Sequence, residues 1–209
     1  MSKILKTDKR LIDEGYRYRL DGDLISEDDL DLTDLDKPLF VSGSIKADGY
    51  IEADRSIQAG GYIEADGYIK SGGYIEADRY IKADRYIEAD GYIKSGGSIQ
   101  AGGYIQAGGS IKSDWYIQAG GYIKSGGGYG ISAGLYIEAK TTISFGLKLF
   151  AGVCLWRGIS NEEKTITCTE LLGGGTVEYG IVNIIREEER KPREIIVDGV
   201  TFVERLEDE

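Results

Sequence analysis

An isoleucine stands at every sixth position from Ile45 to Ile123 without a break. Ala or Ser follows two places later, with Lys, Glu or Gln between, as in Ile51-Glu52-Ala53. This alternation predicts a short strand with two inward side chains, and the Asp or Gly that comes next predicts a turn. An α-helix, with 3.6 residues per turn, cannot keep a six-residue period on one face. Because such short strands bury little alone, the period predicts an all-β solenoid whose coils stack around a shared Ile/Ala interior.

The charged residue that stands between the two inward residues of each six-residue unit, or hexad, indicates how many hexads make one coil. Two hexads per coil would stack Glu52, Glu64 and Glu76 about 4.8 Å apart, and like charges directly opposite one another are unfavourable. With three hexads per coil, no like charges meet along the first nine hexads, although Lys94 then lies over Lys112. We therefore predict a three-sided coil of about 18 residues.

This register also predicts which surface residues form rows. Five tyrosines fall into one external ladder, namely Tyr50, Tyr68, Tyr86, Tyr104 and Tyr122. Three aspartates, Asp48, Asp66 and Asp84, fall into a row along one edge. Stacked tyrosines can stabilise neighbouring coils, or they can form a strip that contacts a partner.

Three segments follow from where the period holds. Residues 1–40 are expected to form an acidic N-terminal cap, and residues 41–152 the hexapeptide-repeat solenoid of about six coils, near 30 Å long. The period is interrupted at residues 126–130 by two extra residues. Residues 153–209 are expected to be β-rich, with strands at 165–168 and 176–185 and a hairpin around Asp198-Gly199, serving as a cap or a dimerisation module.

Composition limits the chemistry that the chain can support. There are 36 acidic and 25 basic residues, no histidine and two cysteines, Cys154 and Cys168, without zinc-ligand spacing. A net charge of -11 disfavours direct binding to nucleic acid or an anionic membrane, so the expected partner is a basic protein surface. No secretion signal or membrane span is recognisable, which predicts a cytoplasmic protein. We expect no enzyme activity, catalytic residue, metal or cofactor, because acid/base residues converge nowhere in the repeat.

The hexads resemble two families of triangular β-solenoids. Bacterial hexapeptide-repeat transferases place the small residue before the aliphatic one and use a histidine base, which this chain lacks. The order Ile51-Glu52-Ala53 looks more like the bactofilin strand Gly-x-Ile-x-Ala, over about residues 41–152. That resemblance implies a three-sided solenoid and, by analogy, a filament-forming structural protein. In charge and shape the chain is also analogous to acidic repeat rods that mimic DNA.

Two functions are consistent with these features. The first is a nucleic-acid mimic, such as a phage-encoded anti-CRISPR or other anti-defence inhibitor acting in the host cytoplasm, that occupies a basic nucleic-acid-binding groove. Its binding residues would be the five ladder tyrosines together with six corner aspartates, Asp48, Asp54, Asp66, Asp78, Asp84 and Asp90. The alternative is a self-assembling structural rod, bactofilin-like or part of a virion, with a homodimer or larger homo-oligomer formed through residues 151–209.

Overall fold

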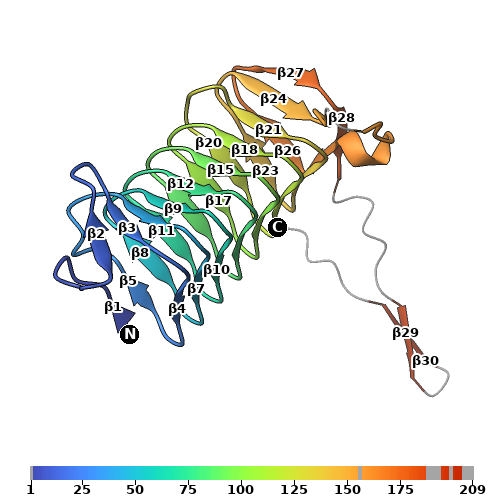
Figure 1. The fold of residues 1–209 in the computed structure, drawn as a ribbon. Coiled ribbons are helices and arrows are strands. Elements are labelled where there is room, and N and C mark those ends of the chain that lie inside the picture. Colours follow the sequence, from blue (N-terminus) through green and yellow to red (C-terminus); the bar gives the residue numbers. More distant parts are fainter. Residues whose placement is uncertain (1, 155–156, 187–193, 198–199, 204–209) are drawn as a thin grey trace.

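The computed structural model describes residues 2–154, 157–186, 194–197 and 200–203. Three long sheets wind around a common axis and form a rod, with the blue N-terminal coils at one end and the orange C-terminal coils at the other (Figure 1). All pairings inside the rod are parallel except that of β2 (Leu11–Asp13) with β3 (Tyr18–Leu20). The predicted all-β solenoid is confirmed.

Each sheet collects one strand from each coil. Sheet 1 contains β4 (Leu24–Ser26), β7 (Ile45–Ala47), β10 (Ile63–Ala65), β13 (Ile81–Ala83), β16 (Ile99–Ala101), β19 (Ile117–Ala119), β22 (Ile137–Ala139), β25 (Thr165–Cys168) and β28 (Ile181–Ile184). Sheet 2 contains β1 (Ser2–Lys3), β5 (Leu30–Asp31), β8 (Ile51–Ala53), β11 (Ile69–Ser71), β14 (Ile87–Ala89), β17 (Ile105–Ala107), β20 (Ile123–Ser125), β23 (Thr142–Ser144) and β26 (Glu170–Leu172). Sheet 3 contains β2, β3, β6 (Leu39–Val41), β9 (Ile57–Ala59), β12 (Ile75–Ala77), β15 (Ile93–Ser95), β18 (Ile111–Ser113), β21 (Ile131–Ala133), β24 (Lys148–Ala151) and β27 (Thr176–Tyr179).

The strand register confirms three hexads per coil. Ile63 pairs with Ile45 and with Ile81, so equivalent residues in the repeat are 18 positions apart. The predicted contact of Lys94 with Lys112 is present between β15 and β18. The rod has about nine turns instead of the six expected, because non-repetitive strands continue the stack at both ends. At about 4.8 Å per coil it is about 40 Å long.

The interior is a column of isoleucine with small residues beside it. The repeat isoleucines from Ile45 to Ile123 are fully buried, and the alanines and serines two places later are at most 5% exposed. The buried serines keep their hydroxyls satisfied; Ser71 Oγ donates to Arg55 O at 2.9 Å and accepts from Gly73 N at 3.1 Å. No buried side-chain polar atom lacks a partner in the described part of the chain. Serine can therefore replace alanine at the inward position before a corner without leaving a buried hydroxyl unsatisfied.

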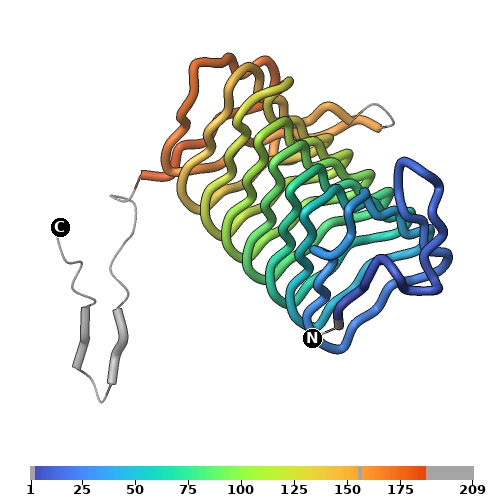
Figure 2. The backbone as a smooth tube through the Cα atoms, turned by 90° about the vertical axis from the view of Figure 1, so that its left-hand side faces the viewer, coloured from blue at the N-terminus to red at the C-terminus, as the bar shows by residue number. Residues whose placement is uncertain are grey.

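The turns between sheets define three edges of the rod, which Figure 2 shows as aligned bends of the tube. The edge between sheets 1 and 2 is called the 1–2 edge, and the 2–3 and 3–1 edges are named in the same way. The predicted break lies on the 2–3 edge between β20 and β21, where Gly128 and Gly130 have φ of 65° and 91°. Glycine adopts such left-handed angles without strain, so two extra residues fit into this corner.

The N-terminal end closes over the interior. Ile4, Leu32 and Leu35 are at most 4% exposed, and the inward leucines of the first coils are equally buried. Two of the acidic residues between 21 and 36 satisfy backbone donors of the first repeat coils: Asp23 Oδ1 accepts from Ser44 N at 2.7 Å, and Asp29 Oδ1 from Tyr50 N at 3.2 Å. Part of the acidic run therefore has a structural role in the cap.

The C-terminal strands continue the stack instead of forming a separate layer. The predicted strand at 165–168 is β25, and the predicted strand at 176–185 is divided at Gly180 into β27 and β28. Between β24 and β25 lies a loop that contains the 3₁₀-helix η1 (Glu162–Lys164). The predicted hairpin is present as β29 (Glu194–Val197) and β30 (Val200–Val203), which pair only with each other. The solenoid sheets thus extend on both sides of residues 41–152.

Candidate functional site

The 1–2 edge carries half of the predicted aspartates and all of the predicted tyrosines. Asp48, Asp66 and Asp84 directly follow successive strands of sheet 1 and are exposed, and three of the ladder tyrosines lie two residues after them in the chain. Neighbouring rings of the ladder have centroids 4.8–4.9 Å apart and planes within 4° of parallel, from Tyr50 through to Tyr122. The edge therefore combines a short acidic row with a continuous tyrosine stack.

The other three aspartates lie elsewhere on the rod. Asp54 and Asp90 lie on the 2–3 edge with Gly72 at the equivalent position between them, and Asp78 lies on the 3–1 edge. All three are exposed. The six corner aspartates consequently face three directions, and a flat partner can contact only one row at a time.

The ladder tyrosines are held by their neighbours. Each ring between Tyr50 and Tyr122 stacks on both sides, so its faces are already covered. Tyr68 Oη donates to Glu52 Oε2 at 3.0 Å and Tyr104 Oη to Glu88 Oε2 at 2.9 Å, each reaching the preceding coil. Burial together with these hydrogen bonds raises the pKa of both phenols above the ordinary value. These contacts favour the structural interpretation of the ladder.

Three shorter tyrosine stacks were not predicted. Tyr62 stacks on Tyr80 and Tyr116 on Tyr136 along the 3–1 edge, and Tyr74 stacks on Tyr92 along the 2–3 edge. The same 18-residue register identifies them, because each pair occupies the position before an inward isoleucine. Every edge of the rod is therefore reinforced by aromatic stacking.

The acidic row is partly neutralised by lysines of sheet 1. Lys46 Nζ lies 3.8 Å from Asp48 Oδ1, and Lys82 Nζ lies 3.9 Å from both Asp84 Oδ1 and Glu64 Oε1. These pairs are exposed, so each contributes little to stability, but they reduce the negative potential of the row. Asp66 is the member of the row without an ion pair to lysine or arginine among the described residues.

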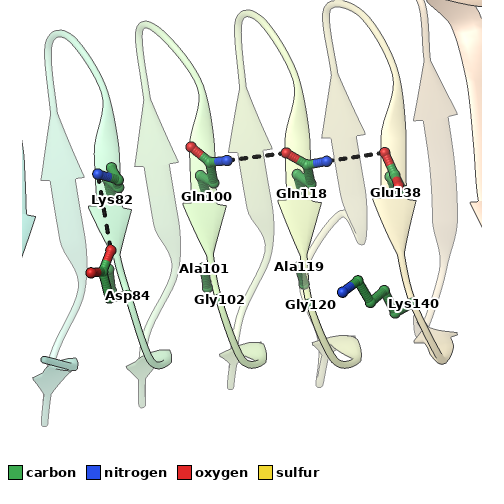
Figure 3. Close-up of a pocket in the computed structure, with 11 residues that line it drawn as sticks. Lys82, Asp84, Gln100, Ala101, Gly102, Gln118, Ala119, Gly120, Glu138 and Lys140 are labelled. Atoms are coloured by element: carbon green, nitrogen blue, oxygen red, sulfur yellow. Dashed lines mark hydrogen bonds and ion pairs between the residues drawn. The ribbon is translucent and has the colours of Figure 1, made fainter. Parts of the chain in front are cut away.

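A shallow cavity of about 300 Å³ lies further along sheet 1, where Gly102 and Gly120 replace the corner aspartates. Figure 3 shows a line of side chains above it: Gln100 donates to Gln118 at 3.1 Å, and Gln118 donates to Glu138 at 3.1 Å. Lys82 and Asp84 stand at one end and Lys140 at the other. The cavity offers amide hydrogen bonds and balanced charge, without a nucleophile beside a base.

Within the described ranges, no group of three or more His, Cys, Asp or Glu side chains is arranged to hold a metal ion. Cys154 and Cys168 are free thiols, and burial raises the pKa of Cys168. No helix among the described residues has the length and apolar character needed to cross a membrane.

The C-terminal end of the rod is open. Among the described residues, the last strands, β26, β27 and β28, each have a neighbour on one side only. Val182 and Ile184 pair in register with the fully buried Ile166 and Cys168, so they occupy inward positions, yet they are 40% and 41% exposed. This end presents unpaired strand edges around an apolar centre, which is a typical template for further association.

Comparison with known proteins identifies no relative: no family model, no curated protein and no solved structure matches this chain.

Proposed function

We propose that this protein is a non-enzymatic structural rod that pairs with a second copy through its open C-terminal end. The observation that carries the proposal is the difference between the two ends. The inward leucines Leu20, Leu24, Leu30 and Leu39 of the N-terminal coils are at most 2% exposed, whereas Val182 and Ile184 in the last coil are 40–41% exposed. A solenoid end needs a cover, and strand edges of another rod provide both hydrogen bonds and an apolar contact.

The closed N-terminal end restricts how copies can associate. At the N-terminal end β1, β2 and β4 are also edge strands, but Ile4, Leu32 and Leu35 cover the interior there, so this end presents no apolar centre to a head-to-tail neighbour. Two rods joined at their C-terminal ends satisfy both edges by one two-fold axis, and such an isologous contact is closed. The expected assembly is a dimer about twice as long as one rod.

Charge at the open end does not oppose this contact, although the whole chain carries a net charge of -11. The last three strands contain two charged residues, Glu170 and Glu178. Glu178 is paired, with Lys148 Nζ 3.4 Å from its Oε1. The open end could also be covered by the chain's own hairpin, β29 and β30. The experiment therefore has to distinguish contact with a second copy of the rod from contact with this hairpin.

We expect the full chain to elute with a mass twice 22.9 kDa when static light scattering is coupled to gel filtration. The double variant Val182→Asp/Ile184→Asp should be monomeric, because two charges would be buried in an apolar contact. Ile25→Asp, at an exposed position of the N-terminal coils, is the matched control and should stay dimeric. Circular dichroism checks that each variant is folded.

Ile196→Pro tests the hairpin, because proline is disfavoured inside a strand such as β29, where Ile196 is paired with Thr201 of β30. A monomeric wild type that dimerises with Ile196→Pro would assign the end to the hairpin and overturn the proposal. Concentration-dependent filaments would also overturn it, because they require an adhesive N-terminal end.

A second candidate function rests on the row of Asp48, Asp66 and Asp84: a mimic of nucleic acid that binds the basic groove of a nucleic-acid-processing enzyme. One strand of DNA carries a charge about every 3.4 Å along the axis, whereas this row repeats about every 4.8 Å and has lysines beside it. The geometry therefore supports this function less strongly than the structural rod.

Matched charge reversals on different edges test the mimic. Asp48→Lys/Asp66→Lys/Asp84→Lys changes one row, and Asp54→Lys/Asp78→Lys/Asp90→Lys makes the same charge change on the other two edges. If the row binds a basic groove, the first variant should lose salt-sensitive capture of nucleic-acid-binding enzymes from bacterial lysate and the second should keep it. Equal capture by both variants would eliminate the row as the contact.

A further inference from the structure

One tyrosine is missing from the stack on the 3–1 edge. Tyr62 and Tyr80 stack at 4.8 Å, Tyr116 and Tyr136 stack at 4.9 Å, and Ser98 occupies the equivalent position in the coil between the two pairs. The backbone is uninterrupted there: Ile81 N donates to Ser98 O at 3.0 Å, and Ile99 N donates to Tyr116 O at 3.0 Å. Ser98 is therefore in register with the tyrosines but leaves the ring position empty.

The empty position has the thickness of one aromatic ring. Tyr80 and Tyr116 are two coils apart, so their rings are separated by about twice the 4.8 Å spacing of the stacked pairs. A planar ring placed midway would stack on both at the distance that the rod already uses. One face of Tyr80 and one face of Tyr116 are left without a stacking partner by the serine.

The neighbouring corner position enlarges the gap into a cavity. Gly97 lies between Arg79 and Trp115 in successive coils, so this coil has no side chain between them. A cavity of about 300 Å³ adjoins the gap and is lined by Asp78, Arg79, Tyr80, Ser98 and Trp115 together with Gly96 and Gly97, while Tyr116 lies outside this lining, on the far side of the gap. Trp115 is 54% exposed, which is unusual for a large aromatic side chain.

We propose that the gap between Tyr80 and Tyr116 together with this adjoining cavity, called the Ser98 slot, binds one aromatic side chain of a protein partner. The two open ring faces select a flat apolar group, and the Asp78 carboxylate can accept a hydrogen bond from a phenol or an indole. Asp78 and Arg79 offset each other, so the slot favours a neutral ring over a charged one. A single ring buries little area, and it binds usefully when it anchors a larger contact, as aromatic hot spots do.

The slot is independent of the proposed dimer, because it lies in the middle of the rod and not at its end. Its test is a titration of the ¹⁵N-labelled full chain with N-acetyl-tyrosinamide, which stands for the partner's side chain. We expect saturable shifts of the Gly97 amide and the Trp115 indole signals at millimolar concentration. No shift at these signals would overturn the proposal.

Ser98→Tyr fills the slot and should abolish the shifts, while Ser44→Tyr, which adds a ring beside Tyr62 at the end of the same stack, should leave them unchanged. Persistence of the shifts in Ser98→Tyr would place the binding elsewhere and refute the slot. A second arm uses adenosine: tighter binding of adenosine at the same signals would indicate a nucleobase site and overturn the assignment to a side chain.

The stability of Ser98→Tyr is a second measurement that does not depend on a ligand. The new ring should join the stacks above and below it and raise the melting temperature by about 2–6 °C. Tyr86 is a precedent, since it stacks on both sides while its phenol interacts with Lys70, 16 residues earlier, and Lys82 stands in the same relation to position 98. An unchanged or lower melting temperature would show that the gap does not fit a ring.

Discussion

Replacing Ile87 by alanine should lower the free energy of unfolding by about 2–5 kcal/mol. Ile87 is fully buried and lies between Ile69 and Ile105 in the central part of the column. Coils with nearly identical backbones cannot collapse far to fill the space that three lost carbons leave, because the strands above and below fix their spacing. Urea denaturation followed by circular dichroism measures the effect.

Gln58→Ala is the matched control for Ile87→Ala. Gln58 is the outward residue of β9, within the same regular series of hexads as Ile87. Its substitution should change the free energy of unfolding by less than about 0.5 kcal/mol. If the two variants had similar stability, the isoleucine column would not be the main source of the rod's stability. Loss of cooperativity in Ile87→Ala would show that the coils on its two sides unfold separately.

The rod should keep its full stability up to about pH 10 and unfold as the pH rises through about 12. Burial and the hydrogen bond to Glu64 raise the pKa of Tyr80 to about 12, and similar contacts raise the pKa values of Tyr68, Tyr92 and Tyr104. An unfolded tyrosine has a pKa of about 10, so the folded state favours the neutral phenol. The stabilisation is complete below the unfolded value and is lost between the two values as the phenols ionise.

Alkaline titration followed by tyrosinate absorbance and circular dichroism tests this dependence. Ionisation should coincide with loss of β-structure for the stacked tyrosines, whereas the protein unfolded in urea should ionise near pH 10. Tyr68→Phe, which removes a phenol and keeps the ring, should retain more structure above pH 11 than the wild type. If most tyrosines ionised at pH 10 with the fold intact, the stacks would contribute little to holding the coils together.

The repeat was predictable because one residue type repeats on one period. The Ile period specifies the strand, and the alternation of Lys and Glu specifies three strands per coil, including the contact of Lys94 with Lys112. The N-terminal coils could not be placed because Leu24 pairs with Ile45 across 21 residues instead of 18. At the other end Ile137 pairs with Ile166 across 29 residues, since the loop with η1 intervenes.

The surface was less predictable than the interior. Aspartate has two different roles in this chain. Asp23 and Asp29 accept backbone hydrogen bonds in the N-terminal cap, whereas Asp66 is an exposed charge, and only the hydrogen bonds seen in the structure distinguish the two roles. The open C-terminal end follows from β28 being the last strand of its sheet in the described part of the chain, which no local sequence pattern indicates. The Ser98 gap, by contrast, can be read from the 18-residue register once the tyrosine stacks are recognised.

The parallel strand pairing between neighbouring coils also determines how the rod would respond to a pulling force. The two ends of the stack lie far apart, so tension along the axis loads the contacts of one coil at a time, starting at the less protected C-terminal coil (Figure 1). Each coil of the regular repeat that peels away releases 18 residues, or about 60 Å of extended chain, in exchange for about 4.8 Å of rod. Such a rod is stiff until one coil yields, and within the regular repeat it then lengthens in equal steps, which would limit the peak force on whatever it joins.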